Sequence, residues 1–261
     1  MAKHEAGWAV TPVVRPIATP ILGVLLAAVL ASAAAAENFV GDDSSETLTG
    51  TPEPDQIYAE AGNDTIAGLE SNDYLEAGSG GDAVDGGTGI DLIIGGTGDD
   101  RIVGGNGNDV VYAGADDDEV IGGAGGDHLF GQVGDDRLFG GPDDDLIYAG
   151  AGTDFADGGS GSDRITSDGD ATLIGGPGSD TISVAGGNAN VDAGPDADRV
   201  KTGAGRDEVT GGAGTDWIGT GRGRDSVDAR DGERDVVYCG KGRDRVEADP
   251  VDRVAGCEIR R

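Results

Sequence analysis

The sequence is poor in large side chains and in positive charge. Of its 261 residues, only 4% are aromatic and 18 are Lys or Arg, against 50 Asp or Glu and 51 Gly. So few large side chains give a compact globule little with which to offset its backbone entropy, and without help such an acidic tract behaves as a disordered polyanion. A formal net charge of −32 argues against nucleic acid as a partner, because binding it needs clustered basic side chains, and favours a hard cation.

Motifs for catalysis are missing as well. His128 is the one histidine beyond residue 36, and no serine lies in a Gly-x-Ser-x-Gly elbow. His4 and Glu5 lack the second histidine of a zinc-protease motif. Runs of aspartate such as 116–118 and 143–145 are better explained as loop ligands or turn residues than as glycosidase carboxylates. We therefore expect no enzymatic activity. The alternative, a carbohydrate-active enzyme on a β-helix, would need an acidic cleft that interrupts the repeats, and the sequence shows none.

What the chain does have is a repeat of nine residues. An aspartate returns in phase thirteen times: Asp55, Asp64, Asp73, Asp82, Asp91, Asp100, Asp109, Asp118, Asp127, Asp136, Asp145, Asp154 and Asp163. Two residues after each stands an aliphatic residue: Ile57, Ile66, Leu75, Val84, Ile93, Ile102, Val111, Val120, Leu129, Leu138, Ile147, Ala156 and Ile165. A fixed period of this length indicates a repeat architecture.

Each repeat is typical of a turn followed by a short strand. Six turn-forming residues, with glycine where the backbone needs a positive φ, precede three residues of which the middle one is aliphatic and points inward. One such unit cannot bury its aliphatic side chain alone. Stacked units, with one turn and strand on each side, predict an all-β parallel β-solenoid with about 18 residues per coil.

Stacking also brings the aspartates together. Coils lie about 4.8 Å apart, so aspartates 18 residues apart form columns of carboxylates. Such columns need a cation, and Ca²⁺ is suited to them because it takes six to eight oxygen ligands, here from Asp side chains and loop carbonyls. Magnesium is less suited, since it demands octahedral geometry and keeps its waters. The sequence therefore predicts several bound calcium ions.

The phrase Gly86-Gly87-Thr88-Gly89-Ile90-Asp91 and its copies over about residues 50–250 resemble the nonapeptide repeat of the RTX, or hemolysin-type calcium-binding, family. The resemblance implies a right-handed parallel β-roll, calcium in the Gly/Asp turns between neighbouring coils, and folding after secretion into calcium-rich surroundings. By position it assigns these metal ligands: Asp82, Asp91, Asp100, Asp109, Asp118, Asp127, Asp136, Asp145, Asp154, Asp163, Asp180, Asp198 and Asp216. The departures are Thr172 and Ala189, which have no carboxylate, and loops in which Arg precedes the aspartate.

Alternate repeats fall on opposite sides of the solenoid. The positions of Thr172 and Ala189 both lie on the side of Asp100, so we predict one continuous ion column and one interrupted column. The outward strand positions on the side of Asp91 form an apolar stripe, a candidate partner surface that comprises Leu92, Ile94, Tyr112, Phe130 and Tyr148. It would bind a protein, a second copy of the chain or a cell-surface glycan. The alternative is the ordinary preference of strands for such side chains.

Residues 1–36 are typical of a secretory signal peptide. Lys3 and Arg15 precede or flank an apolar run over 17–30, and Ala34-Ala35-Ala36 provides small residues for cleavage. The run is short for a membrane span of about twenty residues. We expect a secreted, extracellular protein without a transmembrane span after cleavage, structural or adhesive in role. If the leader is kept, the protein is an anchored adhesin at the cell surface.

The remaining chain divides by its loop chemistry. Residues 37–81 are expected to form degenerate capping repeats, 82–163 the regular calcium-binding array, 164–235 degenerate and Arg-bearing repeats of the same solenoid, and 236–261 a C-terminal cap. Cys239 and Cys257 are separated by 18 residues, or one coil, so in an exported protein they are expected to form a disulfide. Closing that loop is worth about 3 kcal/mol.

Overall fold

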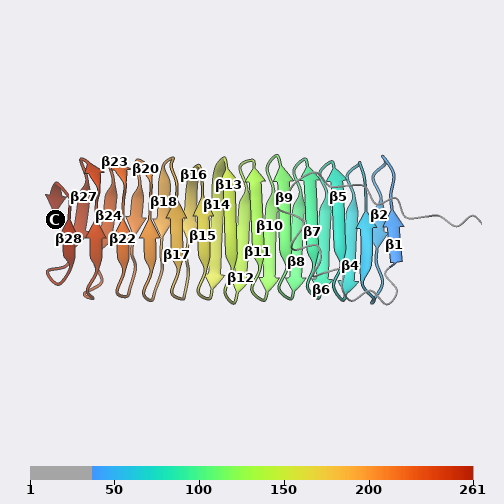
Figure 1. The fold of residues 1–261 in the computed structure, drawn as a ribbon, viewed down its shortest axis with the longest axis horizontal. Helices are drawn as coiled ribbons and strands as arrows, with labels where there is room; N and C mark the ends of the chain where they lie inside the picture. Colours follow the sequence, from blue (N-terminus) through green and yellow to red (C-terminus); the bar gives the residue numbers. More distant parts are fainter. Residues whose placement is uncertain (1–36, 261) are drawn as a thin grey trace, which may run out of the picture.

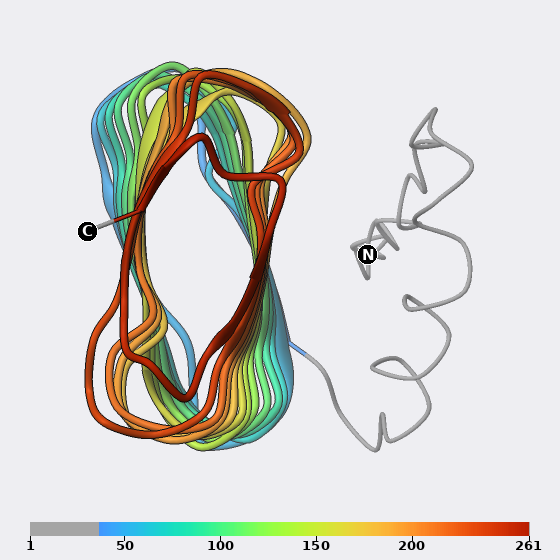
Figure 2. The same cartoon turned by 90° about the vertical axis from the view of Figure 1, so that its left-hand side faces the viewer.

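Two parallel sheets of 13 strands each form the long sides of the molecule (Figure 1). The computed structural model describes residues 37–260, and over that range the chain winds as one solenoid whose strands alternate between the sheets. Viewed along the axis, each coil is a flattened ring with two straight sides joined by turns (Figure 2). The predicted fold class, a parallel β-roll, is confirmed. The predicted signal peptide lies outside the described residues.

The first sheet, sheet A, consists of the strands that follow the turns of one side. They are β1 Glu37–Val40, β3 Asp55–Tyr58, β5 Tyr74–Ser79, β7 Leu92–Thr97, β9 Val110–Ala115, β11 His128–Val133, β13 Leu146–Ala151, β15 Arg164–Ser167, β17 Thr181–Val184, β19 Arg199–Lys201, β22 Trp217–Gly219, β25 Val236–Tyr238 and β28 Arg253–Ala255.

The second sheet, sheet B, takes the alternate strands. They are β2 Thr47–Thr49, β4 Thr65–Glu70, β6 Ala83–Thr88, β8 Arg101–Asn106, β10 Glu119–Ala124, β12 Arg137–Pro142, β14 Thr153–Ser160, β16 Asp170–Ile174, β18 Ala189–Asp192, β21 Glu208–Thr210, β24 Ser226–Ala229, β27 Arg245–Ala248 and β29 Ile259–Arg260. A small third sheet, sheet C, joins β20 Ala204–Gly205, β23 Arg222–Gly223 and β26 Lys241–Gly242 at the C-terminal end.

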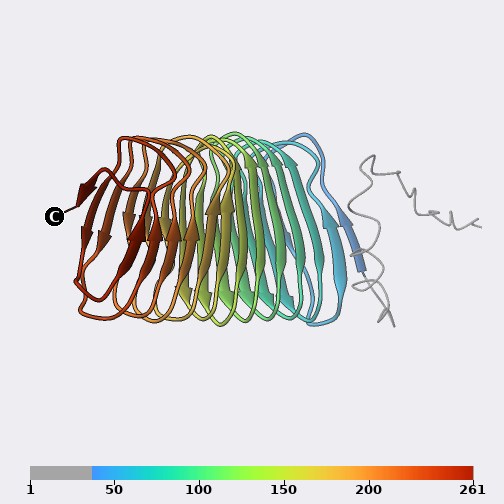
Figure 3. The same ribbon diagram turned by 60° about the vertical axis from the view of Figure 1, so that its left-hand side comes forward.

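The core is a double row of aliphatic side chains between the sheets. Ile93 pairs with Leu75 and Val111 in register, and all thirteen aliphatic positions expected from the repeat are exposed by 3% or less. The row continues through Leu173, Ile182, Val191, Val200, Val209, Ile218, Val227, Val237 and Val246. Because each coil adds one such residue to each sheet, neighbouring coils bury a face that a single coil cannot. The row thereby holds the turns of successive coils in line (Figure 3).

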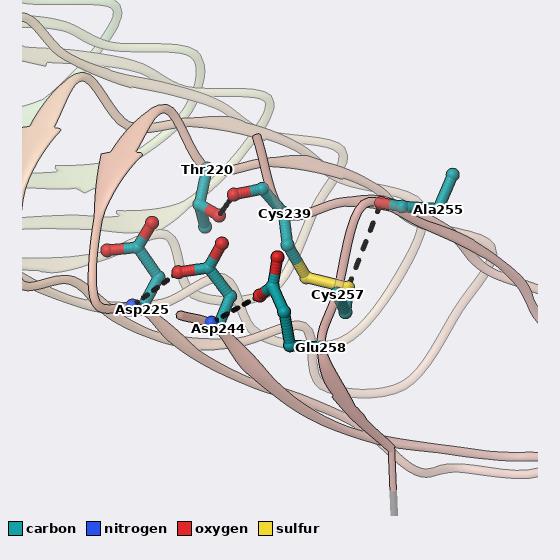
Figure 4. The surroundings of a disulfide bond; sticks show 7 residues. All are labelled: Thr220, Asp225, Cys239, Asp244, Ala255, Cys257 and Glu258. Carbon is teal, nitrogen blue, oxygen red and sulfur yellow. Dashed lines mark hydrogen bonds between the residues drawn. A yellow bond between two sulfur atoms is a disulfide. The ribbon is translucent and has the colours of Figure 1, made fainter. Parts of the chain in front are cut away.

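The C-terminal coil is closed by the predicted disulfide. Cys239 and Cys257 are bonded, with their Cα atoms 5.1 Å apart (Figure 4). The backbone N–H of Cys239 donates to the carbonyl of Ala255, and the N–H of Asp244 donates to the Glu258 carboxylate, so side chains and hydrogen bonds hold the same two coils. The bond therefore fixes the last coil against fraying.

Within residues 37–260, no helix is long and apolar enough to cross a membrane.

Candidate metal centre

The regular nine-residue spacing of the aspartates places them in two columns in the structure. All thirteen predicted ligands are buried, with 3% exposure or less, at the point where a turn enters a strand. In each column the backbone N–H of one aspartate donates to Oδ1 of the aspartate in the next coil: Asp91 to Asp109 at 2.8 Å, and Asp109 to Asp127 at 2.8 Å. One carboxylate oxygen is thus used to tie each coil to the next.

The second oxygen of each carboxylate has no partner. Oδ2 is buried without a hydrogen bond in every predicted ligand from Asp82 to Asp216. An unpartnered buried acceptor is costly, and a buried charge without a counter-charge is more costly still. Each carboxylate in the column therefore has one oxygen that still needs a hydrogen-bond donor or a cation.

The first glycine of the turn leaves room beside this oxygen. A Cβ added to Gly86 would lie 2.6 Å from Oδ2 of Asp91 and 2.4 Å from the carbonyl oxygen of Gly104, which belongs to the next coil. The same pairing of a carboxylate oxygen with a carbonyl oxygen recurs at Gly104 and at Gly122. Two acceptors converge on the same small space with no donor between them, which is the environment that a hard cation completes.

Burial also disfavours the negative charge that these carboxylates carry. It raises the pKa of Asp91 to about 7 and that of Asp127 to about 7, although in each case the N–H of the preceding coil lowers it. Neighbouring aspartates of the same column raise both values further, because like charges lie one coil apart. The column is therefore under electrostatic stress at neutral pH unless protons or cations neutralise it.

The carboxylates are spread along the columns rather than gathered at points. Over residues 37–260, no three His, Cys, Asp or Glu side chains converge into one metal cluster. Because Ca²⁺ takes six to eight oxygens, loop carbonyls would have to supply ligands beside the Asp side chains, which is what the sequence predicts.

The two aspartate columns differ in continuity, and the matching difference between the ion columns stays a prediction. The column at the entry to sheet A is tied without a break from Asp55 to Asp252. The column at the entry to sheet B is interrupted after Asp154 and resumes at Asp207, whose Oδ1 accepts from the N–H of Ala189. The prediction that the vacancy lies at Thr172 is wrong, because Asp154 pairs with Ala171.

The error has a simple cause. The coil from Asp163 to Asp180 has 17 residues, one fewer than its neighbours, and the missing residue falls in the turn before β16. Thr172 consequently pairs with Phe155 and occupies an outward strand position. Counting by nine from Asp163 placed the vacancy one residue too late.

Several aspartates outside the predicted set have the same environment. Six further aspartates are buried with an unpartnered Oδ2: Asp64, Asp73, Asp207, Asp225, Asp235 and Asp244. The spacing of the repeat already included Asp64 and Asp73. They were left out because their turn sequences depart from the regular phrase.

The candidate partner surface lies on the outer face of sheet A but is partly self-covered. Tyr112, Phe130 and Tyr148 stack as nearly parallel rings, with centroids 4.7 and 5.2 Å apart. Tyr148 is exposed by 39%, Ile94 is half-buried, and Leu92 is exposed by only 2%, since it packs beside Tyr74 and Val110. Leu92 therefore cannot contact a partner, and that part of the prediction is wrong.

A comparison with protein families bears on the whole solenoid. The model described as RTX calcium-binding nonapeptide repeat (4 copies) matches residues 40–75, 60–93, 94–129, 130–165, 165–188 and 192–227, well over half of the chain. The chain belongs to this RTX family. No curated protein matches it. The RTX repeats make it a calcium-binding β-roll, and the unpartnered Oδ2 atoms fit calcium-binding turns. The assignment of individual aspartates as calcium ligands in this RTX protein stays a prediction.

Proposed function

We propose that this protein is exported and that its β-roll folds when Ca²⁺ binds outside the cytoplasm, where it serves a structural or adhesive role. The observation that carries the proposal is the unbroken column of buried aspartates whose Oδ2 atoms have no partner. In a cytoplasm poor in calcium these charges repel one another and oppose folding, whereas bound calcium joins each coil to the next.

The roles of the residues follow from their positions. Oδ1 of each aspartate orients the carboxylate through the N–H of the preceding coil, and Oδ2 is the oxygen left for the ion. At Gly86, Gly104 and Gly122 the lack of a side chain leaves the space beside Oδ2 open to an ion, whereas Ala113 and Ala149 place a methyl group at the same turn position in other coils. Bound calcium supplies positive charge and further coordination to these oxygens. Because Oδ1 is already fixed, the carboxylate loses little freedom on binding.

Export is supported by two features. Disulfides persist in oxidising compartments, and Cys239 and Cys257 are bonded. The leader over 1–36 has the composition of a signal peptide. N-terminal sequencing of the protein from its producing cell checks the leader: a start at or near Glu37 supports secretion, and an intact leader favours the anchored adhesin.

We expect no catalysis. His128 lies exposed on the outer face of sheet A, in register with Val110 and Leu146, and makes no hydrogen bond through its side chain to any residue described. No nucleophile or acid in the described part of the chain is therefore hydrogen-bonded to its imidazole. Hydrolysis of a panel of polysaccharides by the purified protein would contradict this expectation.

Circular dichroism during calcium titration tests the folding proposal. We expect conversion from coil to β structure between micromolar and millimolar calcium, and no equivalent conversion with magnesium. Replacing Asp91, Asp109 and Asp127 by Asn should raise the calcium concentration required. Asp43 and Asp192 are exposed, so replacing them by Asn provides a control that removes charge without touching a column. Full folding of the unaltered protein in a chelator would disprove the proposal.

A further inference from the structure

Three successive turns at the C-terminal end differ from all the regular ones. The phrase Gly-x-Gly-Arg-Asp occurs at 203–207, at 221–225 and at 240–244, each time on the turn that leads into sheet B. These turns pair with one another as sheet C, with Ala204 beside Arg222 and Arg222 beside Lys241 (Figure 1). The pairing brings Arg206, Arg224 and Arg243 into one column along the axis. We call it the arginine column.

The guanidinium groups of this column have no protein partner. Arg206, Arg224 and Arg243 are exposed and, among residues 37–260, form no ion pair and no side-chain hydrogen bond. Other arginines do find partners: Arg101 pairs with Glu119, and Arg199 lies 4.0 Å over the ring of Trp217. Like charges one coil apart repel, so a bound anion would stabilise the arginine column, and the protein itself, over residues 37–260, supplies no such counter-charge.

A groove runs beside the column. Its volume is about 460 Å³, and it is lined by the three arginines together with Asp207, Glu208, Asp225, Ser226 and Arg245. Asp207 and Asp225 are buried and turn Oδ1 toward the backbone of the preceding coil, so they offer little to the groove. Glu208 is the exposed carboxylate there, against the three unpaired guanidinium groups of the arginine column, since Arg245 is ion-paired with Glu247. The groove is thus an open, basic channel parallel to the solenoid axis.

The position of the groove reflects an uneven distribution of charge. Residues 199–261 hold 13 of the 18 Lys and Arg residues and 13 of the 50 Asp and Glu residues, whereas 37–198 holds 3 basic residues against 36 acidic ones. The C-terminal quarter of the solenoid is therefore neutral overall, and one row of turns there holds Arg206, Arg222, Arg224, Lys241 and Arg243. An anionic ligand finds its favourable site there and is repelled by the rest of the molecule.

We infer that the arginine column binds an extended acidic polysaccharide, with its carboxylate or sulfate groups following the three turns. Guanidinium groups match the planar, bidentate geometry of such oxyanions. The column presents a charge at each coil, about 4.8 Å apart, which suits a linear chain with regularly spaced acidic groups. The inference goes beyond calcium-dependent folding and needs the folded solenoid, because only the fold aligns the three turns.

The lining of the groove disfavours other polyanions. Single-stranded nucleic acid is held by aromatic side chains on which bases stack, and no aromatic residue lines this groove. A protein partner is normally anchored by apolar or aromatic side chains, which the groove does not have. Polar, charge-based contact with a flexible saccharide strand fits these features best.

Calorimetry or fluorescence titration of the calcium-loaded, full-length protein tests the inference. The probes are a chondroitin sulfate oligosaccharide, neutral dextran of similar length and a single-stranded oligonucleotide. We expect the acidic oligosaccharide to bind, dextran not to bind, and affinity to fall as salt rises. The triple variant Arg206→Ser, Arg224→Ser, Arg243→Ser should weaken binding about tenfold or more. Arg101→Ser, Arg137→Ser, Arg164→Ser removes the same charge from other coils and should leave it nearly unchanged.

Circular dichroism in calcium separates loss of the site from loss of the fold. If the triple variant does not fold, Arg224→Ser alone, at the centre of the column, provides the test. Equal loss of affinity in both triple variants would show non-specific attraction and overturn the inference, as would a failure of the folded protein to bind the acidic oligosaccharide. Tighter binding of the oligonucleotide, lost with the arginine column, would overturn the assignment to a polysaccharide. None of these results depends on where calcium is bound.

Discussion

Replacing Asp127 by Asn should have opposite effects with and without calcium. Asp127 is fully buried in the unbroken column, its Oδ1 accepts from the N–H of Asp109, and its Oδ2 has no partner. Asn keeps the carbonyl oxygen for that N–H and replaces the unpartnered oxygen by a neutral NH₂ group. Without calcium the substitution removes a repelling charge, whereas with calcium it removes a ligand.

The size of the effect follows from the raised pKa. Burial raises the pKa of Asp127 from 3.8 to about 7, with Asp109 and Asp143 adding to it. At about 1.4 kcal/mol per pKa unit, ionisation of this one group costs the metal-free fold up to about 4 kcal/mol, and solvent screening near the turn reduces this to about 2 kcal/mol. That amount is enough to shift a marginal folding equilibrium visibly.

Circular dichroism at pH 8 provides the assay. In metal-free buffer, Asp127→Asn should show more β structure than the unaltered protein, and in saturating calcium its Tm should be lower. Asp192→Asn, at an exposed position, should change neither. Equal destabilisation of Asp127→Asn in both buffers would refute the reasoning, because it would mean that Oδ2 has a protein partner rather than an ion.

Three further predictions follow from the same structure. The metal-free protein should gain β structure as the pH falls from about 8 to about 5. The pKa values of the column aspartates in the folded state, about 6 to 7, exceed the unfolded value of 3.8. The folded state is therefore stabilised by protonation at low pH and loses that stability as the pH rises through these pKa values. Calcium should abolish that dependence, and a metal-free protein that unfolds on acidification would contradict it. Cys257→Ser should cost about 3 kcal/mol in calcium, read from urea unfolding, and should expose the last coil to proteolysis first; unchanged proteolysis would count against the role of the disulfide. Gly105→Ala should cost about 1–3 kcal/mol, because φ is +116° and the new Cβ would lie 2.1 Å from the Gly87 carbonyl oxygen. Gly232→Ala should cost less, since φ is also positive there (+89°) but a new Cβ would meet nothing within 4 Å; equal effects would show that contact with the neighbouring coil does not matter at Gly105.

The disulfide could be predicted from the sequence, whereas burial on the outer face of sheet A could not. The disulfide followed from a spacing of one coil, although the turns around it have irregular lengths. The partner surface was only half right, because period-2 alternation places Leu92 outward but does not show that Tyr74 and Val110 pack over it. Burial on the outer face depends on neighbours one coil away, whose ring orientations the sequence does not encode locally. The candidate partner role of Ile94, Tyr112, Phe130 and Tyr148 stays a prediction.

By itself, the sequence determined the solenoid, the core row and the calcium chemistry, because strict repetition at nine residues leaves one way to bury the aliphatic positions and aligns the aspartates at the same time. Only the tertiary structure decided where a coil departs from 18 residues and which side chains the irregular turns bring together. A coil one residue short moved the vacancy to Ala171, and the pairing of three separate turns aligned Arg206, Arg224 and Arg243 beside a groove. Such features depend on contacts between residues 17 to 19 positions apart, and only the stacked coils bring those residues together.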